Sequence, residues 1–512
     1  MMAQSFSGVN ADMDNNLTTL EPGMPVIIGG GRVSRVSEEL AREFQPGDNL
    51  LVVRKSGELL RIPKAVQEIA GSAVDAALSA FESQQSADDE QFTSFYTGFA
   101  DRLSDESIWE EIRKANEADV ARAREKGRST TRLVADEKMR KNMIAGLNQW
   151  RDLASRRDKV VGSVEHDGWV VDEVVSPCGV VGFVFEGRPN VLADATGVLR
   201  SGNTAVFRIG SDALNTAKSI MEHALKPALE KAGLPSSAVV LLESTEHSAG
   251  WALFADPRLA LAVARGSGRS VDLLGAIARE AGNAVSLHGT GGGWIIADEA
   301  ADPKKFNLAV YNSTDRKVCN TVNTICIPRS RSAELVGEML KALSSRGEKL
   351  GYGYRVHVAQ GSEDIIPTEL FSKETGVYRA DGLKTEMTAT LLPADQLGKE
   401  WEWEQTPEVT VKAIENLEEG IELFNSQSPL LVSSLISENA DAHERFLKGI
   451  NAPFVGNGFT RWVDGQYALC RPELGLSNWQ NGRLLARGGV LTGDGVYTIK
   501  LRVRQADPDV HR

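Results

Sequence analysis

The chain has 512 residues, with 57 Lys and Arg against 70 Asp and Glu, which gives a formal net charge of −13. Hydrophobic residues at 42% and charged residues at 25% are ordinary for a globular protein and exclude a wholly disordered chain. The acidic balance argues against nucleic acid as the main partner, because phosphate neutralisation requires a basic surface.

The N-terminal segment 1–63 predicts a disordered tail followed by a small appended unit of unknown role. Residues 1–20 are polar and show neither the basic cluster nor the apolar stretch of a secretory signal. Residues 26–28 predict a strand that enters a triple-glycine turn. We interpret this turn as structural, since the rest of a phosphate-binding fingerprint is missing. A helix is predicted over 37–44 and a hairpin over 50–62.

Helices are predicted next, and after residue 160 short strands alternate with helices. Such alternation is the pattern of a doubly wound parallel sheet, which binds ligands at the carboxyl ends of its strands. An aromatic stripe in the second helix is typical of core. The longest apolar run, 180–185, is far shorter than the ~20 residues that span a bilayer, so we expect a cytoplasmic protein with no membrane partner. Helices are predicted over 65–81, 92–103, 108–126, 139–153, 213–232 and 270–281, and strands over 169–175, 180–185, 205–208, 238–242 and 259–264.

Cys319 stands in the sharpest local pattern of the chain, DRKVCNT over 315–321. The thiolate is the reactive form of cysteine, and Arg316 and Lys317 supply two cations that are expected to lower the thiol pKa. On spacing alone, a buried unreactive cysteine is the better interpretation, and Cys326 in a strand-like segment is an example. The four cysteines are too few for a disulfide scaffold, and with seven scattered histidines they predict no metal site.

A series of short motifs resembles γ-glutamyl phosphate reductase, also called glutamate-5-semialdehyde dehydrogenase, a branch of the aldehyde dehydrogenase superfamily. The resemblance covers about residues 65–505 and does not extend to 1–63. Each motif is weak alone, but their shared order is a strong signal. The motifs are PCGVVG (177–182), EGRPNV (186–191), SGNTAV (201–206), RGSGR (265–269), HGTG (288–291), VCN (318–320), TRWVDG (460–465), ELGLS (473–477) and LARG (485–488).

The resemblance implies the nicotinamide-dependent reduction of an acyl phosphate, γ-glutamyl phosphate or a relative, to an aldehyde. Cys319 matches the catalytic cysteine, whose thiolate would form a thioester as phosphate leaves. Asn190 matches a side-chain donor to the oxyanion, with the backbone N–H of Cys319 as the second donor. Ordinary ion pairing is the alternative for the arginines. The implied substrate- and phosphate-binding residues are Arg188, Arg316, Asn320, Arg461 and Arg487.

For the cofactor, the resemblance implies NADP in preference to NAD. Arg208 falls where the superfamily often has a cation near the ribose, and an arginine can grip a phosphate with paired donors. Ser267 and Gly268 match a helix start that faces the pyrophosphate, although a plain strand-to-helix turn is the alternative. The implied cofactor-binding residues are Arg208, Gly210, Ser211, Ser267, Gly268 and Glu186.

The sequence departs from the family pattern on the substrate side. Asn323 stands where glutamate is usual, and Trp294 stands where a histidine is common. Residues 426–431 (SQSPLL) replace a polar segment, and the approach to the nucleophile over 314–318 is one residue shorter. The identity of the substrate side chain is therefore open.

Two other functions stay open. A non-phosphorylating aldehyde dehydrogenase needs a general base for water, and it is disfavoured because residues 286–291 carry no carboxylate where ordinary aldehyde dehydrogenases use glutamate. A degenerate member that only binds nucleotide or a partner protein is opposed by the intact Cys319 and Asn190.

The alternation and the resemblance together imply an α/β fold of the aldehyde dehydrogenase kind. A Rossmann-type cofactor domain is expected over 64–292 and a catalytic domain over 293–438, with a return to the cofactor domain at 439–460. The hairpin 160–175 and the tail within 461–512 resemble oligomerisation strands. We therefore expect a homodimer or a higher homo-oligomer, with an upstream kinase as a candidate source of the acyl phosphate.

Overall fold

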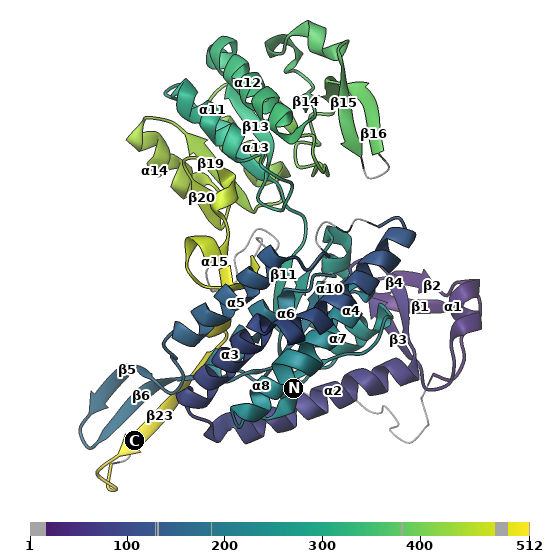
Figure 1. The fold of residues 1–512 in the computed structure, drawn as a ribbon, viewed down its shortest axis with the longest axis vertical. Helices are drawn as coiled ribbons and strands as arrows, with labels where there is room; N and C mark the ends of the chain where they lie inside the picture. Colours follow the sequence, from purple (N-terminus) through teal and green to yellow (C-terminus); the bar gives the residue numbers. More distant parts are fainter. Residues whose placement is uncertain are drawn as a thin grey trace, which may run out of the picture.

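Figure 1 shows two α/β bodies, one above the other, each built on its own parallel sheet. A small N-terminal unit lies at one flank of the lower body, and a three-stranded sheet projects from the opposite flank. Among the residues that the structure describes, no helix is both long enough and apolar enough to cross a membrane. The computed structural model describes residues 17–128, 130, 133–185, 187–379, 382–476 and 490–510.

The N-terminal unit consists of two hairpins joined by a short helix. The triple-glycine turn at residues 29–31 has positive φ at all three positions and leads into a second strand, which confirms that it is a structural turn. The predicted helix follows, with Ser37 as its N-cap, and a small core of Leu20, Val36 and Phe44 holds the unit together. The elements are β1 (Pro25–Gly29), β2 (Arg32–Arg35), α1 (Glu38–Glu43), β3 (Asn49–Val53) and β4 (Glu58–Ile62).

Four helices precede the first sheet, as the apolar periodicity predicts. They are α2 (Lys64–Ser83), α3 (Asp89–Ser104), α4 (Glu106–Glu125) and α5 (Glu137–Asp152). Asp88, Asp105 and Asp136 accept backbone N–H groups in the first turns of α3, α4 and α5, which is why these helices begin where they do. The aromatic stripe of α3 is buried, which confirms that it belongs to the core.

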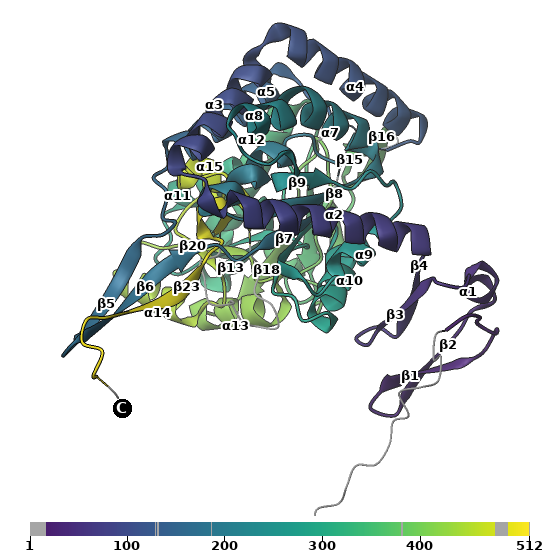
Figure 2. The ribbon, with the colours of Figure 1, turned by 90° about the horizontal axis from the view of Figure 1, so that it is seen from below.

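Five parallel strands form the lower sheet: β7 (Val180–Phe185), β8 (Thr204–Ile209), β9 (Val239–Leu241), β10 (Leu259–Arg265) and β11 (Val285–His288). Their order, β11-β10-β7-β8-β9, is the doubly wound arrangement that the alternation predicts. Val181 and Phe183 of β7 share a core with α3, whereas Val180 and Val184 share one with α2. Helices therefore cover both faces of this sheet, as Figure 2 shows for α2 and α3.

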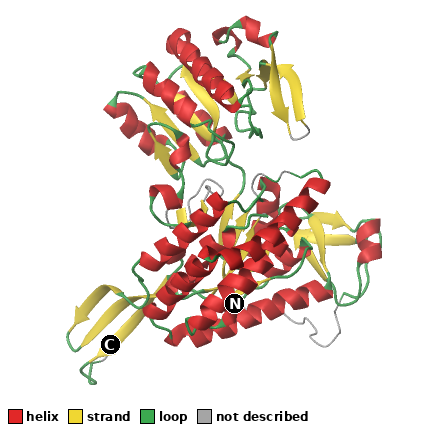
Figure 3. Ribbon diagram, viewed as in Figure 1, coloured by secondary structure: helices red, strands yellow, loops and turns green. Residues whose placement is uncertain are grey.

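Shorter helices connect the strands of the lower sheet. The helix predicted over 213–232 contains a π-helical turn at Met221–Leu225, just before Pro227, which has no N–H for the regular ladder. Figure 3 shows how these helices flank the strands. They are α6 (Val191–Ala195), α7 (Leu214–Ile220), α8 (Lys226–Lys231), α9 (Ser248–Phe254) and α10 (Gly268–Glu280).

The upper body is a parallel sheet of seven strands. Its strands are β12 (Gly293–Ala297), β13 (Val322–Pro328), β14 (Arg355–Ala359), β17 (Ala389–Leu392), β18 (Glu408–Ile414), β19 (Val432–Ile436) and β20 (Phe454–Gly456), in the order β17-β14-β18-β13-β12-β19-β20. A hairpin, β15 (Glu374–Arg379) and β16 (Gly382–Met387), stands beside it. Its helices are α11 (Pro303–Asn312), α12 (Ser332–Leu350), α13 (Leu417–Gln427) and α14 (Ala440–Gly449).

The predicted return to the cofactor domain at 439–460 is wrong. This segment forms α14 and β20, and β20 pairs with β19 at the edge of the upper sheet. The chain instead returns after α15 (Gly465–Ala468), through β21 (Glu473–Leu476), which contacts β10 and β11. No local signal in so short a strand tells which sheet it joins, because that depends on its distant partner.

The projecting sheet is antiparallel and joins distant parts of the chain. β5 (Val160–His166) and β6 (Trp169–Ser176) form the predicted hairpin, and β23 (Thr498–Gln505) pairs with the other edge of β6. β22 (Val490–Thr492) pairs with β21 in an antiparallel arrangement. The predicted strand character of the tail is confirmed.

Candidate active site

A cleft of about 1000 Å³ lies where the carboxyl ends of β7, β8 and β10 face the loop before β13. The strand ends supply Phe185, Arg208 and Arg265, and the facing loop supplies Arg316 and Lys317. The cleft therefore opens between the lower sheet and the loop that carries Cys319, at the place where a doubly wound sheet binds its ligand.

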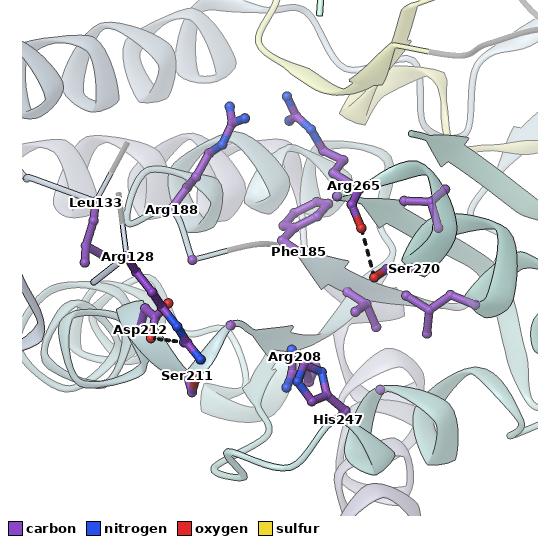
Figure 4. Close-up of a pocket in the computed structure, with 18 of the residues that line it drawn as sticks. Arg128, Leu133, Phe185, Arg188, Arg208, Ser211, Asp212, His247, Arg265 and Ser270 are labelled. Carbon is purple, nitrogen blue, oxygen red and sulfur yellow. Dashed lines mark hydrogen bonds and ion pairs between the residues drawn. The ribbon is translucent and has the colours of Figure 1, made fainter. Parts of the chain in front are cut away.

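Basic side chains gather in this cleft although the chain is acidic overall. Arg128 pairs with Asp212 at 2.6 Å, and Lys317 pairs with Glu400 at 2.5 Å. Figure 4 shows Arg188 and Arg265 reaching toward one side of the cleft, with Arg128 and Arg208 on the other. The basic residues that line the cleft are Arg128, Arg188, Arg208, His247, Arg265, Arg316 and Lys317.

Arg208 lies at the end of β8 and lines the cleft, as a cofactor-binding residue should. One of its terminal nitrogens donates to the backbone carbonyl of Glu246 at 3.1 Å. Its Nε is buried and has no partner among the described residues, and burial lowers the pKa of the guanidinium. A buried donor without an acceptor calls for an anionic or hydroxyl group nearby, which a ligand in this cleft could supply.

The other predicted cofactor residues that the structure describes lie beside the same cleft. Gly210, Ser211 and Ser267 line it, and Ser267 is the N-cap residue of α10. A Cβ on Gly268 would overlap the hydroxyl oxygen of Thr290, so the Thr290 side chain would have to move to admit a larger residue at this helix start. Exposed N–H groups there can bind an anion. Glu186 lies outside the described residues.

Cys319 lies beside the cleft, directly after Val318, which lines it. Glycine backbone is pressed against the cysteine: the N–H of Gly292 donates to the Cys319 carbonyl at 2.7 Å, and a Cβ on Gly291 would lie 2.5 Å from the Cys319 Cα. On its other side the thiol packs against an apolar cluster. The cluster consists of Leu431, Val432, Phe454, Val463 and Leu476.

The expectation that neighbouring cations lower the thiol pKa is wrong in net direction. Burial raises the pKa of the Cys319 thiol, and the Glu473 carboxylate raises it further. Arg265, Arg188 and Lys317 oppose this rise without overcoming it. Cys326 is fully buried in β13, as predicted, and its pKa is raised by burial to about 12.

Asn190 follows β7 and precedes α6, on the same side of the sheet as the cleft. Its Nδ2 donates to the carboxyl of Asp194 at 3.0 Å. Burial is the main cause that raises the pKa of Asp194 to about 7. Because an amide nitrogen carries two N–H groups, Asn190 can hold Asp194 and still present a donor to an oxyanion.

The predicted substrate-binding residues separate into two groups. Arg188 and Arg316 line the cleft. Arg461 instead donates to Asp315 at 2.7 Å and to the side-chain oxygen of Asn320. Asn320 in turn donates to the carbonyl of Val463, so this pair fastens the loop that carries Cys319 to the segment after β20. Arg487 lies outside the described residues.

Two of the four departures from the family pattern, Trp294 and Asn323, have structural explanations. Trp294 is fully buried in β12 and meets Phe424 edge-on, with ring centroids 5.6 Å apart, so it is a core residue. Asn323 is buried and binds two backbone groups of the loop before β18, the carbonyl of Lys399 and the N–H of Trp401. Neither side chain lines the cleft.

The structure also brings together charged residues to which the sequence assigned no role. Arg265 approaches Glu473 at 3.5 Å, and Glu473 accepts the N–H of Gly465 at 2.6 Å. His288 binds the carbonyl of Leu476 through Nδ1 at 2.8 Å, and burial lowers its pKa to about 4. Arg265, His288 and Glu473 lie within the motifs RGSGR, HGTG and ELGLS, and these motifs were the sequence feature from which their place near Cys319 could have been predicted. Asp194, four residues after Asn190, could have been found from helical spacing.

Comparisons with known proteins identify the family. The sequence profile of the aldehyde dehydrogenase family matches residues 54–361. The chain is similar to the γ-glutamyl phosphate reductase of Bacillus mycoides, at 27% identity over 388 residues, with 74% of this chain and 85% of that protein covered. It is also similar to the γ-glutamyl phosphate reductase of Bacillus cereus, at 28% identity, with 76% of this chain and 87% of that protein covered.

Solved structures agree on the fold. The crystal structure of γ-glutamyl phosphate reductase from Thermotoga maritima matches with a TM-score of 0.73 at 24% identity, covering 86% of this chain and all of that one. Propionaldehyde dehydrogenase from Rhodopseudomonas palustris matches with a TM-score of 0.59 at 16% identity, covering 85% of this chain and 94% of that one. With the family profile spanning more than half of its length and this fold around Cys319, the chain belongs to the aldehyde dehydrogenase family.

Proposed function

We propose that the chain reduces an acyl phosphate to an aldehyde through a thioester on Cys319, with γ-glutamyl phosphate or a related acyl phosphate as substrate. The observation that carries this proposal is the position of Cys319, held by glycine backbone beside a cleft lined with basic side chains. Relatives named γ-glutamyl phosphate reductase, matched over three quarters of the chain, support the same reaction class.

The chain's own residues account for the acyl-transfer step. The Cys319 thiolate attacks the acyl carbon, a carbon–sulfur bond forms, and the bond to the phosphate oxygen breaks. Asn190 and the backbone N–H of Cys319 would donate to the oxyanion of the tetrahedral intermediate. Arg188 and Arg265, which already act on the thiol electrostatically, would stabilise the departing phosphate.

A reduced nicotinamide dinucleotide fits the remaining part of the cleft and, when bound, supplies the hydride that reduces the thioester. Arg208, Gly210 and Ser211 would hold its adenosine half, and Ser267 with the start of α10 would hold its pyrophosphate. We propose NADP in preference to NAD. The unsatisfied Nε of Arg208 and the Arg128 guanidinium at the same end of the cleft support this preference.

The hydrolytic alternative needs a carboxylate that activates water. Residues 286–291 contain none, but the fold brings Glu473 close enough to influence Cys319 from a distant segment. Glu473 is engaged by Arg265 and by the backbone of Gly465, so it is poorly placed to accept a proton from water. We therefore keep the phosphorylating reaction as the proposal.

The test is a Cys319→Ala variant assayed for aldehyde oxidation with NADP or NAD, in the presence and absence of phosphate or arsenate. We expect activity that depends on phosphate or arsenate in the parent protein and a loss of at least about a thousandfold in the variant. Cys178→Ala, at an exposed cysteine, is the matched control. Undiminished turnover in Cys319→Ala would exclude the thioester, and equal rates without phosphate would favour the hydrolytic enzyme.

A further inference from the structure

Three segments of the site meet at the carboxylate of Glu400, in the loop before β18. Its Oε2 accepts the backbone N–H of Gly291 at 2.9 Å, and its Oε1 binds the Lys317 ammonium at 2.5 Å. The Glu400 side chain is 19% exposed and that of Lys317 is 7% exposed, so solvent screens this ion pair weakly.

Both partners of Glu400 adjoin Cys319. Lys317 precedes the cysteine by two residues, and its charge acts on the thiol. Gly291 packs so closely on Cys319 that a Cβ there would lie 2.5 Å from the cysteine carbonyl oxygen. One carboxylate therefore fixes both a cation and a backbone wall of the nucleophile.

Asn323 sets the direction of Glu400. Its Nδ2 donates to the carbonyl of Lys399 at 2.8 Å, and its Oδ1 accepts the N–H of Trp401 at 2.9 Å. These two residues stand immediately before and after Glu400. A carboxamide supplies the one donor and the one acceptor that this pair of bonds needs, whereas a glutamate supplies acceptors only. The asparagine at this position, where the family usually has glutamate, is thereby explained.

Trp401 is itself held firmly in the upper body. Its ring stacks on His357 at a centroid distance of 3.4 Å, and its Nε1 donates to Thr410 of β18 at 2.8 Å. His357 is bound by the buried Glu408 at 2.9 Å. The loop that carries Glu400 therefore rests on a rigid support.

We propose that Glu400 is a positioning residue that fixes Lys317 and Gly291 against Cys319 and, by neutralising Lys317, one of the three cations that act on the thiol, restrains the reactivity of the thiol in the free enzyme. The catalytic meaning of this inference rests on the proposed function, but thiol reactivity is measurable without substrate. The other charged groups that act on the thiol are Glu473, Arg265 and Arg188, and none of them is altered in the test.

The test measures alkylation of Cys319 by iodoacetamide against pH in the full-length protein, with no cofactor or substrate added. The labelled peptide is quantified by mass spectrometry, because Cys178 and Cys470 are exposed and react as well. Glu400→Gln keeps an acceptor for Gly291 but leaves the Lys317 charge with only the exposed Glu402 carboxylate, 3.9 Å away, as a counter-charge. We expect its labelling midpoint to move to lower pH and its rate at pH 7.5 to rise about threefold to tenfold.

A charge cycle makes the test specific. Lys317→Met should move the midpoint to higher pH, and the double variant Glu400→Gln/Lys317→Met should return close to the parent profile, because both charges are then gone. The double variant is also the milder change for folding, since it leaves no unpaired buried charge. Glu402→Gln is the matched control in the same loop, because Glu402 lies 3.9 Å from Lys317 and is 77% exposed.

Three results would overturn the inference: identical profiles for Glu400→Gln and Glu402→Gln, a midpoint that moves upward in Glu400→Gln, or a shift that persists undiminished without Lys317. Circular dichroism confirms that each variant is folded. Failure of the proposed function would appear separately, as phosphate-dependent turnover that survives Cys319→Ala.

Discussion

At the scale of single residues, the surroundings of Cys319, the proposed nucleophile, are set more by backbone than by charge. Gly291 and Gly292 form one wall of Cys319, where no side chain could fit, and apolar side chains form another. The net result is a thiol with a raised pKa, so its activation depends on what surrounds it in the working complex. Basic residues that precede a cysteine in the sequence are therefore not sufficient evidence that its thiol is ionised.

Gly291→Ala should impair catalysis, because the change displaces backbone directly beside Cys319. The added methyl group would lie 2.5 Å from the Cα of Cys319, so either the nucleophile or the glycine loop must move. We expect kcat/KM to fall by at least about tenfold, since a shift of about an ångström in a reacting group is costly. Gly337→Ala, in α12 with open space around it, is the control and should be neutral or stabilising. Unchanged kinetics in Gly291→Ala would show that the backbone at residue 291 can move away without disturbing Cys319, and would contradict this prediction.

Asp194→Asn should change the pH dependence of stability. The folded-state pKa of about 7 lies above the usual 3.8, so the stability that the protonated carboxyl contributes is present at low pH and is lost as pH rises toward 7. The amide has no such loss, and it still accepts from Asn190. The free energy of unfolding is measured in urea at pH 5 and at pH 8. Between these two pH values, the variant's free energy of unfolding should rise relative to the parent's by up to about 3 kcal/mol. A difference that stays constant with pH would contradict this.

At the scale of elements, the projecting sheet has two unlike faces. Asp172 on one face is paired with Arg502 and Arg504, which holds the pKa of this carboxyl well below its usual range. On the other face Val164 and Val503 both stand opposite Val171. Val164 is 56% exposed and Val503 is 58% exposed. Glu173, which stands opposite Leu501, is an acidic residue on this otherwise largely apolar face. An exposed face of this kind indicates a partner, and a second copy of the chain is the one we expect.

Leu501→Arg should therefore weaken self-association. Leu501 is 69% exposed on the apolar face and adjoins Val503 along β23, so a charge there would oppose burial. We expect a dimer or a larger oligomer for the parent protein in sedimentation velocity at micromolar concentration and a shift toward monomer for the variant. Lys500→Glu, one residue away on the opposite face, should leave the distribution unchanged. A parent protein that is monomeric under these conditions would refute the interface.

At the scale of the whole molecule, local patterns predicted the elements well, and long-range pairing decided what they could not. The hairpin at β5 and β6, the strands β7 to β10 and the buried Cys326 followed from spacing and residue type. The placement of β20 did not, because three residues cannot specify which sheet they join. The roles of Glu400 and Glu473 were missed for the same reason: Glu473 acts on the Cys319 thiol and Glu400 binds Lys317 and Gly291 beside it, each across many residues of sequence, and no local periodicity indicates such a contact.

The pairing of β23 with β6 also bears on how the protein is made. These strands are separated by more than 300 residues, yet together they complete the projecting sheet. During synthesis β6 leaves the ribosome long before β23 is made. The edge of β6 that pairs with β23 therefore stays unpaired until the end of the chain has been synthesised. The surface that we expect to bind a second copy is therefore finished last, after the loop that carries Cys319 has been made.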